Sequence, residues 1–182
     1  MSAEGPARII PVRVSASGLA EATGLDLPRI LDVLHARDHD AGPDEILGAD
    51  LAISVCAELG KRVMVEPRDL ALECLYEYET RGELGSDPGG RAGAIVDGVL
   101  SDVDELDRMI ESVSEHWSVA RMPVVDRNVL RIGLHELRSD RSTPTAVIIS
   151  EAVRLAQTYS TQKSPSFVNG VLATLAKTIR DG

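Results

Sequence analysis

Apolar side chains recur at helical spacing over most of this chain. Between residues 95 and 117 successive apolar positions lie three or four residues apart; they are Ile95, Val99, Val103, Leu106, Ile110, Val113 and Trp117. That spacing places them on one face of a helix, so the pattern predicts one continuous amphipathic helix of six turns. Gly98 lies beside this face. We expect it to allow the close approach of a neighbouring helix.

The last forty residues contain two places where a helix should begin. Thr143-Pro144 and Ser164-Pro165 each precede an apolar run. Ser and Thr are favoured N-caps, and Pro fits the first helical position because its missing amide needs no partner there. The second run predicts a buried final helix with an apolar face of Phe167, Val168, Val171, Leu172, Leu175, Ala176 and Ile179. Replacing Phe167 by Ala should then cost about 3–5 kcal/mol.

Two further helices are predicted in the middle of the chain, with a loop between the first of them and the long helix. Residues 68–80 carry Leu72, Leu75 and Tyr76 on one side, and residues 124–137 have a second apolar face. Gly and Pro crowd residues 82–93, which predicts a loop. Strand patterns are nearly absent and aromatic residues make up only 3% of the chain. The sequence therefore predicts an all-α helical bundle.

Residues 1–65 show a different pattern of short elements. A short strand is predicted near residues 8–14 and a strand-like alternation at residues 61–65. Between them, helices are predicted from Ser17, after Asp26-Leu27-Pro28 and over residues 49–59, where Gly60 ends the last one. We therefore expect a small helical N-terminal module at 1–65 and a separate domain at 66–182.

The charge balance excludes a uniformly basic surface. The formal net charge is −10, and neither the first 65 residues nor the remainder has an excess of Lys and Arg. Binding of nucleic acid through the whole surface is therefore not expected, because phosphates demand cations. No run of 18 apolar residues and no signal-peptide pattern is present. We expect a soluble, cytoplasmic protein.

No pattern in the chain indicates catalysis. His35 and His39 lie four residues apart near Asp38 and Asp40, but no third metal ligand accompanies them. His116 and His135 have no nucleophile at a fixed spacing, and no glycine-rich phosphate loop follows a strand. Cys56 and Cys74 are expected to be buried, reduced thiols. We therefore predict no enzyme, no catalytic residues, no cofactor and no metal.

Arginines gather between residues 121 and 141. They are Arg121, Arg127, Arg131, Arg138 and Arg141, with only three acidic residues between 118 and 141. Arg131 falls on an apolar side of its helix, which favours a buried arginine paired with an acid. The other arginines are interpreted as part of a mixed surface.

Four blocks of the sequence together resemble the NusB family of transcription antitermination factors. They are WSVARMPVVDRNVLRI at 117–132, LHEL at 134–137, VIISEAV at 147–153 and SPSFVNGVL at 164–172. The likeness extends back through DGVL at 97–100 to ALECLY at 71–76, and so covers about residues 66–182. It implies two small helical subdomains and no catalysis. It also implies binding of boxA RNA in ribosomal RNA transcripts, together with the ribosomal small-subunit protein NusE, within the transcription elongation complex.

The resemblance also implies which residues face the RNA and the protein partner. Relatives open the first helix with an arginine-rich run, where this chain keeps only Arg68, so RNA affinity is expected to be low unless Lys61 and Arg62 substitute. The loop before the last helix would contribute Gln162, Lys163 and Ser164. Tyr76 can stack on a base, although its register with Leu72 favours the core. The protein partner would meet Arg121, Met122 and Asp126.

Residues 1–65 lie outside the usual NusB plan. Residues 19–25, 30–31, 48–52 and 57–63 resemble the small helical modules that precede the GTPase domain of bacterial translation initiation factor 2. Two alternatives to an RNA-binding adaptor remain. One is a NusB-fold protein-interaction module with weak or no RNA binding. The other is the detached RNA-targeting domain of a ribosomal RNA methyltransferase, although no S-adenosylmethionine motif is present.

Overall fold

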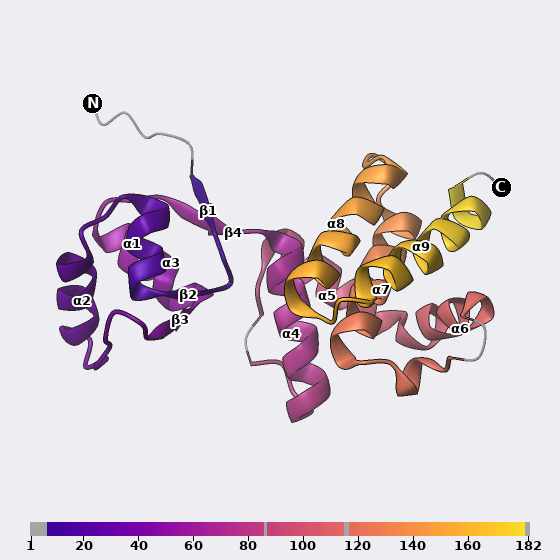
Figure 1. Cartoon of the computed structure of the whole chain (residues 1–182), viewed down its shortest axis with the longest axis horizontal. Helices are drawn as coiled ribbons and strands as arrows, with labels where there is room; N and C mark the ends of the chain where they lie inside the picture. Colours follow the sequence, from indigo (N-terminus) through magenta and orange to yellow (C-terminus); the bar gives the residue numbers. More distant parts are fainter. Residues whose placement is uncertain (1–6, 86, 115–116, 181–182) are drawn as a thin grey trace. The chain divides into compact units, whose positions relative to one another are not determined.

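The computed structural model describes residues 7–85, 87–114 and 117–180 (Figure 1). The chain divides into two compact units, Met1–Leu70 and Ala71–Gly182. We refer to them as unit 1 and unit 2.

Unit 1 combines short helices with two pairs of short strands. Its elements are β1 (Arg8–Ile10), β2 (Arg13–Ser15), α1 (Ala16–Thr23), α2 (Leu27–His35), β3 (Ile46–Gly48), α3 (Ala49–Glu58) and β4 (Val63–Val65), and it includes the start of α4 (Pro67–Arg81). β1 runs parallel to β4, and β2 runs antiparallel to β3. The three predicted helices and the two predicted strand regions are therefore present. Sequence reasoning missed β3, because three residues are too short to show an alternation.

The helices of unit 1 begin and end at residues suited to those positions. The Ser15 hydroxyl accepts a hydrogen bond from the Gly18 amide (3.0 Å) and caps α1. Gly24 ends the same helix with φ of 71°, a left-handed conformation that glycine adopts without strain. Leu19 and Leu34 are completely buried at the centre of the unit. This unit thus has an aliphatic core of its own.

Unit 2 is a helical bundle built around one central helix. Its elements after α4 are α5 (Gly90–Ser101), α6 (Val103–Val113), the short 3-10 helix η1 (Val119–Arg121), α7 (Val124–Ser139), α8 (Thr145–Tyr159) and α9 (Ser164–Arg180). α7 packs against α5, α6, α8 and α9. Its interior side chains, including Leu130 and Leu134, are fully buried. The predominance of helix confirms the all-α prediction.

The predicted continuous helix over residues 95–117 is wrong. The chain leaves helical geometry at Asp102 (φ −109°, ψ 11°), which separates α5 from α6. The Asp102 carbonyl accepts hydrogen bonds from the amides of Glu105 and Leu106, so it opens a new helix. The apolar spacing persists across the break because both helices bury their apolar sides, α5 against α7 and α6 against α7 and α9. Trp117 lies beyond α6 and is 55% exposed.

The two predicted helix starts are each displaced by one residue. Pro144, not Thr143, is the N-cap of α8, and the Thr143 hydroxyl donates to Asp140 instead (2.7 Å). α9 includes Ser164 as its first residue, and the hydroxyl of that serine bonds to a neighbouring helix. The predicted loop is also shorter than residues 82–93, since α5 begins at Gly90.

The apolar face of α9 is buried in its middle and half-buried at its ends. The fully buried members are Val168, Val171, Leu172, Leu175 and Ala176. Phe167 and Ile179 are only partly buried. Phe167 is therefore less buried than the predicted apolar face implied, and truncating it should cost less than the removal of a fully buried aromatic ring.

Gly98 allows the close helix approach that the sequence predicted. A Cβ atom on Gly98 of α5 would lie 2.1 Å from Cε1 of His135 on α7. Only the absence of a side chain at this position leaves room for the imidazole ring. The packing of α5 on α7 depends on this contact.

Candidate functional site

The N-terminal half of α7 carries a buried charge network. Arg131 is 9% exposed, and its Nε and Nη2 donate to the two carboxylate oxygens of Asp107 on α6 (2.7 Å each). Its Nη1 donates to Glu79 on α4, which also accepts from Arg127. Burial alone would lower the pKa of Arg131, but the hydrogen bonds and charges of Asp107 and Glu79 raise it. The predicted buried, paired arginine is confirmed, and it joins α4, α6 and α7.

Asp126 ties the start of α7 to the turn between α8 and α9. We call residues 160–163 the α8–α9 turn. Asp126 is 5% exposed and accepts hydrogen bonds from the hydroxyls of Ser160 (2.5 Å) and Ser164 (2.8 Å). The two serine oxygens lie 3.0 Å apart on this carboxylate. The exposed Gln162 and Lys163 lie between these two anchored residues, so their backbone is fixed from both sides.

The structure separates the five predicted RNA residues into exposed and buried groups. Tyr76 is 44% exposed, so the core position that its spacing from Leu72 favoured is wrong. Gln162 and Lys163 are also exposed. Arg68 is 7% exposed and pairs with Glu66 (3.3 Å), and Ser164 is 2% exposed and bonds to Asp126. Tyr76, Gln162 and Lys163 therefore present their side chains to solvent, whereas Arg68 and Ser164 do not.

Of the three residues predicted for the protein partner, only Arg121 is exposed. Met122 is 3% exposed, and its carbonyl accepts from Arg127 (3.3 Å). Asp126 is buried by the serine contacts described above. Sequence reasoning missed Trp117, because its spacing assigned it to a helix face. Its exposure four residues before Arg121 adds an aromatic side chain to this surface.

Asp126 was expected to meet a protein partner, and its structural role was not foreseen. Ser160 and Ser164 lie four positions apart and flank the turn. These two hydroxyl residues are the sequence feature that could have indicated a carboxylate partner. The carboxylate that receives them is more than thirty residues away. A contact at that separation leaves no local pattern.

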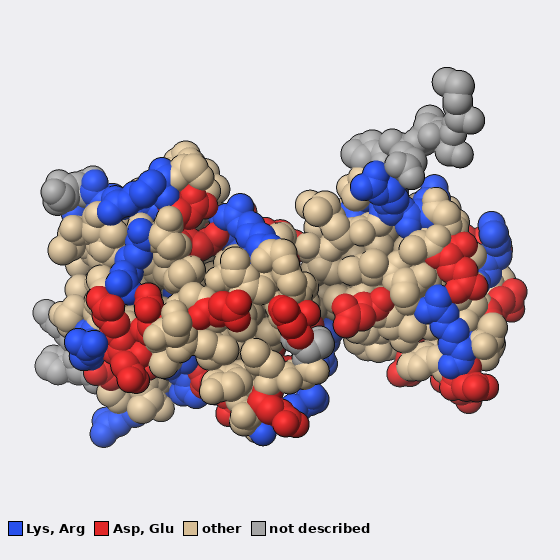
Figure 2. Space-filling view, turned by 180° about the vertical axis from the view of Figure 1, so that it is seen from behind, with Lys and Arg blue, Asp and Glu red and all other residues tan. Residues whose placement is uncertain are grey.

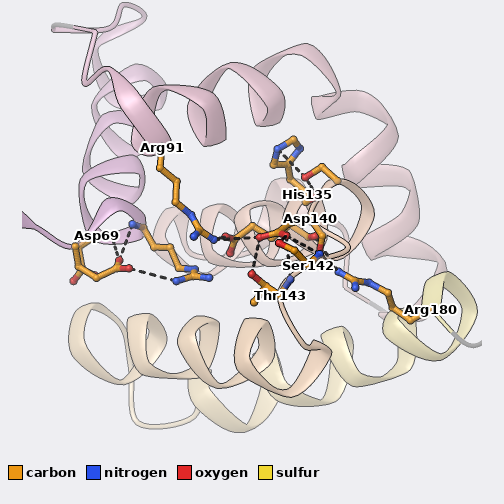
Figure 3. A network of polar contacts seen from close by, with 11 residues as sticks. Asp69, Arg91, His135, Asp140, Ser142, Thr143 and Arg180 are labelled. Atoms are coloured by element: carbon orange, nitrogen blue, oxygen red, sulfur yellow. Dashed lines mark hydrogen bonds and ion pairs between the residues drawn. The ribbon is translucent and has the colours of Figure 1, made fainter.

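A second polar network closes the opposite end of α7 (Figure 3). Asp140 accepts from the hydroxyls and amides of both Ser142 and Thr143 at 2.6–3.1 Å, and these bonds hold the pKa of its carboxyl well below the usual range. Arg91 of α5 contacts the same carboxylate (3.4 Å). Arg180 of α9 donates to three carbonyl oxygens at the end of α7. This network joins α5, α7 and α9 and is structural.

The described residues offer no arrangement typical of an active site. Within them, no group of three or more His, Cys, Asp or Glu side chains is placed to hold a metal ion. Cys56 and Cys74 are both buried, and burial raises the pKa of the Cys56 thiol. His116, considered in the sequence, lies outside the described residues. No helix in the described part of the chain is long and apolar enough to cross a membrane.

Charges of both signs share the surface. On the face shown in Figure 2, Lys and Arg side chains alternate with Asp and Glu, and uncharged residues separate them. No continuous basic band is seen on that face. Binding of an anionic ligand to that face would therefore rest on a few local cations.

Comparison with known proteins gives one consistent result for most of unit 2. The family model described as "NusB family" matches residues 65–177. The transcription antitermination protein NusB of Clavibacter michiganensis subsp. michiganensis is 40% identical over 128 residues, covering 61% of this chain and 93% of that protein. The protein of the same description from Sorangium cellulosum is 40% identical over 126 residues, covering 62% and 90%.

Solved structures agree. T. maritima NusB matches with a TM-score of 0.57 and 31% identity, over 61% of this chain and 88% of that one. A structure of the antitermination factors NusB and NusE in complex with dsRNA matches with a TM-score of 0.54 and 30% identity, over 62% and 94%. The similarity begins near the end of unit 1 and leaves most of that unit unmatched.

Proposed function

This chain belongs to the NusB family, and from that membership we propose that it is an RNA-binding adaptor in transcription antitermination. It would bind boxA-type RNA together with NusE, within the elongation complex, and act in the cytoplasm without catalysis. The observation that carries the proposal is the match over residues 65–177, which includes α7, the α8–α9 turn and α9.

Three exposed side chains form the proposed RNA-binding set. Lys163 supplies a cation for a phosphate, Gln162 supplies donors and an acceptor, and the ring of Tyr76 can stack on an unpaired base. Asp126 holds the α8–α9 turn in place, so Gln162 and Lys163 lose little conformational freedom on binding. With Arg68 buried, few phosphates can be neutralised, and the dependence of affinity on salt should be shallow.

The proposed contact with the protein partner lies at η1. Arg121 and Trp117 are both exposed there, and these two residue types dominate the binding energy of many interfaces. Met122 and Asp126 are buried next to this segment. In this proposal they position the segment and do not touch the partner.

The test measures binding of boxA RNA, with and without NusE, over a series of salt concentrations. Lys163→Ala should weaken binding and reduce the slope of log affinity against log salt by about one. Lys177 is an exposed lysine further along α9, and Lys177→Ala serves as the matched control. It should leave the affinity and the salt slope unchanged. Undetectable binding at low salt under both conditions would remove the RNA role.

A second candidate function is a protein-interaction module that retained the NusB fold with weak or no RNA binding. The net charge of −10 and the burial of Arg68 favour it. In that case NusE should bind equally well with and without RNA. Trp117→Ala should then weaken NusE binding, while Tyr76→Ala should have no effect.

A further inference from the structure

The paired strands β1 and β4 of unit 1 present two aliphatic side chains to solvent. Ile9 lies opposite Met64 and Ile10 lies opposite Val65. Because successive side chains of a strand point to opposite faces, Ile10 and Val65 enter the core, while Ile9 and Met64 point outward. Ile9 is 65% exposed and Met64 is 47% exposed. We call these two strands the β1–β4 ribbon.

Positive charge gathers at one end of the ribbon. Arg8, Lys61 and Arg62 are all exposed there, and the Arg8 amide donates to the Arg62 carbonyl (3.1 Å). Arg62 lies two positions before Met64, on the same side of the chain. Arg8 lies two positions before Ile10, so it is on the other face of the ribbon, where its Nη1 donates to the Ala22 carbonyl (2.8 Å). At the other end of β4, the nearest acidic residue, Glu66, pairs with an arginine. The exposed apolar pair is thus bordered by cations.

A shallow hollow of about 320 Å³ adjoins the same end of the ribbon. Its lining combines aliphatic and basic residues: Ile53, Ala57, Gly60, Lys61, Arg62 and Val63. A volume of this size is at the lower end of ligand pockets. Its mixture of an apolar floor and two cations matches the chemistry of the ribbon beside it.

Nucleic acid fits this surface poorly. Residues 1–70 contain no Phe, Tyr or Trp, whereas single-stranded nucleic acid is held largely by stacking of bases on aromatic rings. Exposed Ile and Met side chains instead suit the aliphatic side chains of a protein. A symmetric contact between two copies of the ribbon is also disfavoured, because it would bring two regions of like charge together.

We propose that the β1–β4 ribbon and the adjoining hollow bind an acidic segment of another protein that carries aliphatic residues. The aliphatic side chains of that segment would cover Ile9 and Met64, and its carboxylates would meet Lys61 at the edge of the hollow. This contact is separate from the RNA and NusE surfaces proposed for unit 2. It gives unit 1 a function of its own.

The test selects peptides from a randomised displayed library on the full-length chain. The expected result is enrichment of peptides rich in Asp or Glu together with Leu, Ile or Val. Binding of a synthesised winning peptide should fall at least tenfold, about 1.4 kcal/mol, in each of Ile9→Ser and Lys61→Glu. The matched controls are Ile46→Ser on β3 and Arg29→Glu on α2, both exposed in the same unit, and they should keep full affinity.

Several outcomes would overturn this proposal. These are enrichment of basic or aromatic peptides, no enrichment, or affinity that survives Ile9→Ser. A single-stranded RNA whose binding is lost in Lys61→Glu would assign the surface to nucleic acid instead. A dimer in sedimentation that Ile9→Ser dissolves would assign it to self-association. Because all four substituted side chains are exposed, melting temperatures should match the unsubstituted chain, which separates lost binding from lost folding.

Discussion

The part of unit 1 that precedes α4 buries a different kind of side chain from unit 2. The core of unit 1 is aliphatic, and its buried Thr23 satisfies its hydroxyl within its own helix by donating to the Leu19 carbonyl (2.6 Å). Unit 2 buries charged groups of distant segments against one another, with Arg131 placed between Glu79 and Asp107. Aliphatic packing tolerates many arrangements, whereas a buried ion pair is satisfied in only a few. We therefore expect the relative positions of the helices in unit 2 to be fixed more strictly than those of the helices in unit 1.

The largest expected effect comes from breaking that buried charge network. Arg131→Ala should lower the free energy of unfolding of unit 2 by about 3 kcal/mol, because Asp107 would lose this partner while Glu79 would keep Arg127. Arg138→Ala on the same helix is the control. Its side chain is 29% exposed and pairs with Glu105 at 3.2 Å, so it should cost about 0–1 kcal/mol. Equal losses in a urea titration would show that the network contributes no more than a surface pair.

Unit 1 should respond to loss of volume. Leu19→Ala removes a completely buried side chain and should cost about 2–5 kcal/mol. Hydrogen exchange should report faster opening within residues 1–70 and unchanged protection in α7. Ile46→Ala, at a 56% exposed position, should change little. If α7 loses protection to the same extent as unit 1, the units do not have independent cores.

A smaller effect is expected at the contact between α5 and α7. Gly98→Ala should cost about 1–3 kcal/mol, because the imidazole of His135 occupies the space of the new methyl group. Gly170→Ala is the counterpart on α9, where a Cβ meets nothing within 4 Å, and it should stabilise by about 0.5–1 kcal/mol. Calorimetry of both variants tests the pair. Adding His135→Ala to Gly98→Ala should recover stability, and a double variant no better than the single one would contradict the clash.

The smallest effect is a dependence of unit 2 on pH. Burial lowers the pKa of His135 below its ordinary value of 6.5. The folded state therefore favours the neutral ring, and stability present above pH 6.5 should decrease as the pH falls through 6.5 toward the folded-state pKa. His135→Gln should flatten this part of the profile. The measurement is a series of urea titrations between pH 7 and pH 5. If the variant and the unsubstituted chain lose stability equally over this range, the dependence belongs to another group.

Local signals in the sequence were sufficient for most helices and for Arg131. α3 and α7 follow from apolar spacing, and the buried pairing of Arg131 follows from its place on an apolar side. The break at Asp102 was not predictable, because the apolar repeat continues through it. The exposure of Tyr76 depends on which helices lie against α4, and spacing along α4 does not reveal them.

The candidate site was harder to predict than the fold. A resemblance identifies which positions face a ligand in relatives, but in this chain Arg68 and Ser164 are buried, where Arg68 pairs with Glu66 and Ser164 bonds to Asp126. The Ser164–Asp126 contact joins residues 38 positions apart, so no local pattern in the sequence reveals it. Sequence reasoning therefore found the turn that carries Gln162 and Lys163, but not the carboxylate that holds it.

The uneven distribution of aromatic residues has a practical consequence for the laboratory. All five aromatic side chains of the chain lie beyond residue 70. Near-ultraviolet absorbance, intrinsic fluorescence and near-ultraviolet dichroism arise from aromatic side chains and therefore report on unit 2, so unit 1 could melt with little change in these signals. Trp117, the sole tryptophan, is exposed two residues before η1, so its emission provides a label-free reporter for a partner that binds at this segment.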